Sequence, residues 1–67
     1  MIKALIVLNG PNGNMEFEVG KKAGSHPERA EVTEIGIATD DKFAVIFETG
    51  ERWTLYCENI IVKSENV

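Results

Sequence analysis

The chain has 67 residues, of which 43% are hydrophobic and 27% charged, and its formal net charge is −4 at pH 7. This length corresponds to one domain, 1–67, and the acidic balance argues against a general nucleic-acid or membrane-surface binder. Cys57 and His26 are each the only residue of their kind, so we expect no intrachain disulfide, no structural zinc site and no cofactor.

The first predicted element is a strand over residues 2–8. This near-continuous apolar run is rich in β-branched side chains and is typical of a strand covered on both faces. It lacks a small-residue cleavage site and is too short to span a bilayer, so it does not have the pattern of a targeting segment. Together with the lone cysteine, this predicts a cytoplasmic protein. A dense turn cluster, 9–14, ends the strand.

Residues 15–19 alternate apolar and acidic side chains, which predicts a half-buried strand. The following segment, 20–29, has no periodicity and contains two glycines, so we expect a loop. Within this loop Ser25 and Glu28 stand three positions apart, as in a capping box, and this spacing allows one helical turn.

A third strand is predicted over residues 30–39, and its apolar phase changes between Val32 and Ile35. Such a change indicates a bulge or a sharp bend near Thr33 or Glu34. The adjacent residues Asp40 and Asp41, which both tolerate turn conformations, predict a tight connection to the next strand.

The stretch 43–57 predicts a β-hairpin that builds most of the core. Apolar side chains alternate along both arms: Phe43, Val45 and Phe47 on the first, and Trp53, Leu55 and Cys57 on the second. A three-residue loop, 48–50, with Gly50 in the left-handed conformation would pair Val45 with Trp53 and place both apolar sets on one face. A two-residue turn would split them between the faces. A short last strand, 61–64, completes the chain.

The segments that decide the fold are 19–21 leading into the long loop, 30–35 as a bent strand, 44–50 as a strand with a glycine turn, and 53–56 followed by the short turn 58–60. In this order they resemble an SH3-like small barrel, of the kind seen in Tudor-type and KOW-type domains. The resemblance implies an all-β, antiparallel barrel of five to six short strands. The strand at residues 2–8 is extra or rearranged relative to that layout.

The hairpin register also predicts a candidate protein-binding surface. The side chains expected on the outer face are those of Ala44, Ile46, Thr54 and Tyr56. Ile46 and Tyr56 are large for positions in solvent, and a rim of Glu48, Arg52 and Glu58 around them is typical of a protein interface. The open alternative is that the first strand covers this patch. An acidic face that could compete for a basic partner surface would come from Glu31, Glu34, Asp40 and Asp41.

These features predict a non-enzymatic module that recognises another protein, as an accessory or inhibitory factor. The alternative function is nucleic-acid binding through the basic residues Lys21, Lys22 and Arg29 of the loop, although the net charge opposes it. Catalysis is disfavoured. No cleft is predicted that would shift the pKa values of the acidic pairs Glu16/Glu18 and Asp40/Asp41. Nor is one predicted that would align the loop neighbours Ser25, His26 and Glu28. A homodimer is expected, centred on Ile46 and Tyr56 or on the first strand, because so small a core is marginally stable alone.

Overall fold

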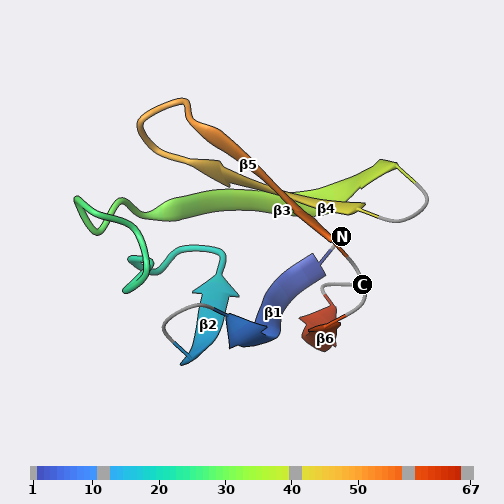
Figure 1. The fold of residues 1–67 in the computed structure, drawn as a ribbon. Helices are drawn as coiled ribbons and strands as arrows, with labels where there is room; N and C mark the ends of the chain where they lie inside the picture. The colour runs from blue at the N-terminus through green and yellow to red at the C-terminus, as the bar shows by residue number, and fades with distance from the viewer. Residues whose placement is uncertain (1, 11–12, 40–41, 57–58, 66–67) are drawn as a thin grey trace.

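The computed structural model describes residues 2–10, 13–39, 42–56 and 59–65. Six strands form, with bounds β1 (Ile2–Gly10), β2 (Gly13–Glu18), β3 (Val32–Thr39), β4 (Lys42–Phe47), β5 (Arg52–Tyr56) and β6 (Ile60–Glu65). Every pairing between these strands is antiparallel, and the described residues contain no α-helix. The chain is therefore an all-β protein whose sheet curls into a half-barrel (Figure 1).

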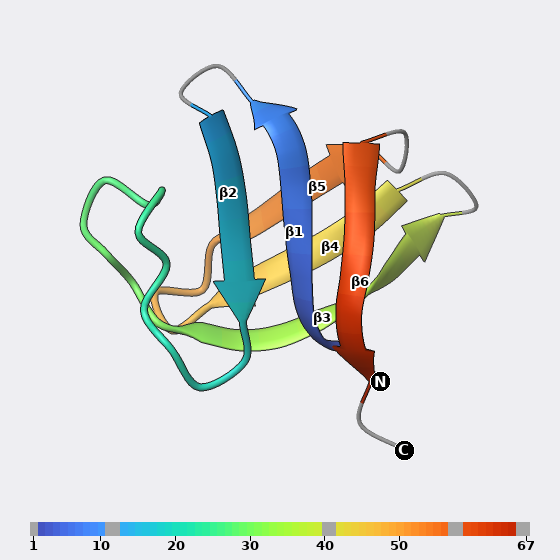
Figure 2. The same ribbon diagram turned by 90° about the horizontal axis from the view of Figure 1, so that it is seen from below.

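The strands form two layers that cross over one another. β1 lies between β2 and β6 in one layer, while β3, β4 and β5 form a meander in the other (Figure 2). One residue pair, Ile2 with Ile35, joins the layers through β1 and β3. The continuous strand order is β2-β1-β3-β4-β5, so β2 and β5 stand at the two ends of the curled sheet. The half-barrel is consequently open between these two strands.

The core lies between the layers. Its largest fully buried side chains come from both layers: Leu5, Phe17, Val32, Ile35, Val45 and Phe47. Side chains alternate along a strand with a period of two, and the register shift between Val32 and Glu34 lets both Val32 and Ile35 of β3 face inward. The core is built of aliphatic and aromatic side chains around two buried loop alanines, Ala23 and Ala30. The loop between β2 and β3 therefore contributes to the core as well as connecting strands.

The predicted hairpin is confirmed in its register. Val45 pairs with Trp53, the Phe47 N–H donates to the Glu51 carbonyl at 3.0 Å, and the Gly50 N–H donates to the Phe47 carbonyl at 2.9 Å. Gly50 has a φ of 91°, a left-handed conformation that glycine adopts without a Cβ clash. The predicted irregularity in the third strand is also present, since the pairing of β3 with β4 shifts between Val32 and Glu34.

The possible helical turn in the loop does not form. Instead the loop makes two successive turns, in which the His26 N–H donates to the Ala23 carbonyl at 3.1 Å and the Arg29 N–H to the His26 carbonyl at 3.0 Å. Pro27 has no N–H to give a helix, and the Glu28 N–H is bound by the His26 side chain. Three predicted features, Asp40-Asp41, Cys57 and Glu58, lie outside the described residues.

The apolar first strand is buried on its inner face, but the predicted cover on its outer face is incomplete, since Lys3 is exposed and Ile6 is half-buried. Leu5 on its inner face is fully buried in the core. On its outer face Ile6 pairs with Glu16 on one side and Ile61 on the other, and Lys63 Nζ donates to Glu16 Oε1 at 3.4 Å across the strand. β1 lies on the core side of β4. The alternative interpretation, in which the first strand covers the outer hairpin patch, is therefore wrong.

Candidate functional site

The outer face of β3, β4 and β5 carries four of the predicted protein-binding residues, Glu34, Ile46, Arg52 and Tyr56. Glu34 pairs with Ile46, and Ile46 pairs with Arg52, so a half-buried aliphatic side chain stands between an acidic and a basic one. Directly opposed side chains in antiparallel strands have Cβ atoms only about 5 Å apart, close enough for these neighbours to interact. This arrangement combines an apolar centre with charges of both signs.

Tyr56 is the most prominent aromatic side chain of this face, with 67% of its surface exposed. Lys42 is its partner on β4, and Lys42 Nζ lies 5.2 Å from the centre of the tyrosine ring. An ammonium group over a ring face is attracted by the ring's negative electrostatic potential, which favours one orientation of the phenol. The tyrosine therefore presents an apolar surface and a hydroxyl at the edge of the sheet.

The predicted acidic residues do not form one cluster in the described part of the chain. Glu31 lies beside the hairpin loop, where its backbone N–H donates to Glu48 Oε2 at 2.5 Å. Glu34 lies on the outer face next to Ile46. The acidic face predicted from the sequence is thus divided between two environments, and Asp40 and Asp41 lie outside the described residues.

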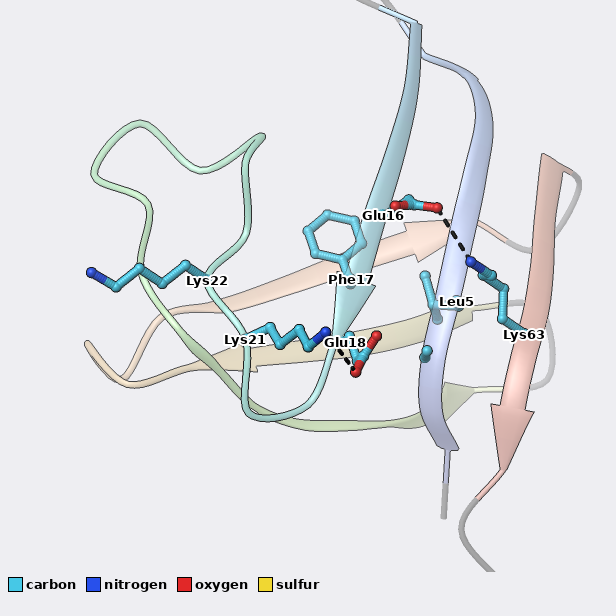
Figure 3. Close-up of a pocket in the computed structure, with 8 residues that line it drawn as sticks. Leu5, Glu16, Phe17, Glu18, Lys21, Lys22 and Lys63 are labelled. Atoms are coloured by element: carbon cyan, nitrogen blue, oxygen red, sulfur yellow. Dashed lines mark hydrogen bonds and ion pairs between the residues drawn. The ribbon is translucent and has the colours of Figure 1, made fainter.

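The basic residues of the loop lie near a pocket of about 180 Å³ formed by β1, β2, the start of the loop and β6 (Figure 3). Lys21 Nζ lies 3.6 Å from Glu18 Oε2, whereas Lys22 points away into solvent. Lys63 reaches the same pocket but is paired with Glu16. Arg29 is exposed, has a φ of 52°, and does not line this pocket. Carboxylates therefore offset much of the positive charge gathered here.

His26 is the one buried polar side chain of the described residues, with 4% of its surface exposed. Its Nδ1 accepts a hydrogen bond from the Glu28 N–H at 3.0 Å, so Nε2 carries the proton and donates to Glu51 Oε1 at 2.8 Å. The imidazole stacks on Trp53, with ring centres 5.3 Å apart and planes 11° apart. Both ring nitrogens are occupied, so this histidine anchors the loop to the β4–β5 hairpin and is not poised as a base for Ser25.

The sequence contains no local signal for this contact. His26 has no neighbours in an alternating or helical pattern, and its partners Glu51 and Trp53 are about twenty-five residues away. Glu51 is the residue whose carbonyl accepts the hydrogen bond from Phe47 at the end of the hairpin. Its hydrogen bond with Thr49, 2.9 Å from Oγ1 to Oε1, orients the carboxylate that receives the histidine. The loop anchor is therefore a tertiary feature that required the fold.

Glu51 should make the stability of the protein depend on acid pH. Hydrogen bonds from His26 and then from Thr49 to the charged carboxylate hold the pKa of Glu51 below its usual value of 4.5. The stabilisation is present above the unfolded-state pKa and is lost as the pH falls through the lowered folded-state pKa. The free energies of unfolding of wild type and Glu51→Gln, measured with urea, should therefore differ most near neutral pH. This difference should become smaller as the pH is lowered. A difference that is constant with pH would contradict this assignment.

The described residues contain no cluster of three or more His, Cys, Asp or Glu side chains that could hold a metal ion. Likewise, no helix in the described ranges is long and apolar enough to cross a membrane. Comparison of the chain with protein-family models, with curated proteins and with solved structures finds no match.

Proposed function

We propose that this chain is a small non-enzymatic module that binds another protein through the outer face of β3, β4 and β5. The observation that supports this most directly is the row Glu34–Ile46–Arg52 beside the exposed Tyr56. Tyrosine and arginine are the residue types that most often contribute large binding energies at protein interfaces. An aliphatic centre with a mixed-charge rim matches the composition of such interfaces.

The charges oppose the alternative of nucleic-acid binding. A protein that binds the phosphate backbone must neutralise several phosphates with free cations. Lys21 and Lys63 are each within ion-pair distance of a glutamate, and the whole chain has a net charge of −4. Lys22 and Arg29 are the remaining exposed cations of the loop, which is too few for strong electrostatic attachment.

Affinity capture with the whole chain tests the proposal, using nuclease-treated lysate of the native host and then the purified partner. Ile46→Glu places a second carboxylate beside Glu34 and should abolish capture, while Lys22→Glu, on a different surface, should leave capture unchanged. Capture that survives Ile46→Glu would exclude this face as the binding surface. Capture that disappears after nuclease treatment and in Lys21→Glu/Lys22→Glu would establish the nucleic-acid alternative instead.

A further inference from the structure

The outer edge of β5 has no strand partner among the described residues, since β5 pairs there with β4 alone. The hydrogen bond from the Phe47 N–H to the Glu51 carbonyl determines which residues turn their backbone toward β4. Because the direction of the backbone groups alternates along a strand, Trp53 and Leu55 also face β4. The N–H and C=O groups of Arg52, Thr54 and Tyr56 therefore face the open edge.

The edge of β2, at the other end of the curled sheet, is protected in ways that β5 is not. The loop that follows β2 turns back on it, and the Lys21 N–H donates to the Glu18 carbonyl at 3.1 Å. Glu16 and Glu18 add negative charge along that strand. Natural proteins discourage pairing at open edges with proline, lysine, bulges or a covering loop. β5, with the sequence RWTLY, contains no proline or lysine and pairs with β4 without a register shift.

We propose that a second copy of this chain pairs with the outer edge of β5, antiparallel and with its twofold axis at Thr54. The pairing joins two β3–β4–β5 meanders into one continuous sheet. It goes beyond the proposed function, because it concerns the backbone edge of β5 and identifies the chain itself as a partner. In this dimer Glu34 and Ile46 stay on the open outer face, whereas Arg52 and Tyr56 contact the second copy.

The register follows from the charges and from the direction of the backbone groups. A twofold axis at Trp53 would pair Arg52 with Thr54 but leave Tyr56 opposite the hairpin loop, and an axis at Leu55 would pair Thr54 with Tyr56 but leave Arg52 without a β5 partner. An axis at Arg52 would bring two arginines together, which is destabilising for directly opposed like charges. An axis at Thr54 lets all three outward-facing residues pair, and places Arg52 beside Tyr56 of the second copy.

The side chains are complementary in this register. The guanidinium group of Arg52 would lie over the exposed ring of Tyr56 in the other copy, a cation–π contact made twice by symmetry. Thr54 would meet its own copy at the axis, and threonine pairs are favourable across strands. Association also supplies stability that a core of this size lacks on its own.

Sedimentation equilibrium of the purified chain, with no other protein present, tests the proposal by a charge exchange. Tyr56→Lys opposes lysine to Arg52 at both symmetric contacts and should weaken dimerisation at least about tenfold, since about 1.4 kcal/mol corresponds to a factor of ten. Arg52→Glu/Tyr56→Lys restores opposite charges at the same two contacts and should recover the dimer. Binding to a foreign protein would not be restored by this exchange, because the partner's charges are unchanged.

Thr54→Pro tests the backbone pairing separately, because it removes an N–H that faces away from β4. We expect a folded monomer, with the thermal transition checked by circular dichroism, whereas Thr54→Val stays dimeric. If Thr54→Pro does not fold, the charge exchange still decides. A wild-type chain that is monomeric at all concentrations, or a dimer lost in Ile46→Glu and retained in Tyr56→Lys, would overturn the proposal.

Discussion

Trp53→Ala should remove most of the stability of the protein. The indole contacts three other rings: Phe47 at 4.8 Å between ring centres, Phe17 at 6.1 Å, and the stacked His26 at 5.3 Å. Replacing a core tryptophan by alanine typically costs roughly 3–5 kcal/mol. A domain of this size has a total stability of roughly 3–5 kcal/mol, so the loss is comparable to the whole free energy of unfolding.

The exposure of Trp53 refines this expectation. The indole is half-buried because it also lines an open groove with Met15 of β2 and Ser25 of the loop. The expected loss therefore falls in the lower half of that range. Trp53→Phe, which keeps an aromatic ring in the cluster, should cost less and serves as the control. Circular dichroism is the measurement, and a Trp53→Ala variant with unchanged melting behaviour would show that the core does not depend on this register.

The hairpin could be predicted from the sequence because its information is local. The apolar alternation on both arms and Gly50 after two loop residues allow one register that puts the large side chains on one face, and this register is observed. The bulge in β3 was predictable for the same reason, since a change of apolar phase between Val32 and Ile35 must be absorbed within the strand.

Long-range contacts could not be predicted in this way. The pairing of β1 with β6 joins the two ends of the chain, and nothing near Ile61 or Val62 specifies Ile6 and Leu5 as their partners. Periodicity was also insufficient for Ile37, which shares the inward phase of Ile35 yet is 71% exposed. It lies toward the end of β3, beyond the buried cluster, so an apolar position on the core side is left in solvent.

The candidate site was predictable to the extent that strand alternation determines it. The outer-face placement of Ile46, Arg52 and Tyr56 follows from the hairpin register, and the structure adds Glu34 and Lys42 as their neighbours. Their role in binding stays a prediction. The acidic residues illustrate the limit of counting charges along the sequence. Glu31 and Glu34 are close in the chain, but the bulge between them and the hydrogen bond to Glu48 separate their environments.

The second large effect is expected at the loop anchor. The imidazole of His26 is buried among Phe47, Trp53 and Glu51, and it binds the Glu28 N–H of its own loop. His26→Ala removes the ring stacking, worth about 0.5–1.5 kcal/mol, and leaves a part-buried N–H without its acceptor, which costs about 1–3 kcal/mol. We therefore expect a loss of about 2–4 kcal/mol in the free energy of unfolding.

In His26→Ala the loop between β2 and β3 should open before the rest of the protein unfolds. Apart from His26, the loop buries only the small side chains of Ala23 and Ala30, so it has little other apolar contact to hold it against the β4–β5 hairpin. In His26→Ala, hydrogen exchange should accelerate most at the Ala23 and Arg29 amides. The exchange rates of the β4 amides should change only as much as the free energy of global unfolding changes. His26→Phe keeps a stacked ring without the hydrogen bonds, so its loop amides should exchange at rates between those of wild type and His26→Ala. Ser25→Ala, which changes an exposed neighbour, should behave as wild type. Loop amides as protected in His26→Ala as in wild type would mean that the histidine does not anchor the loop.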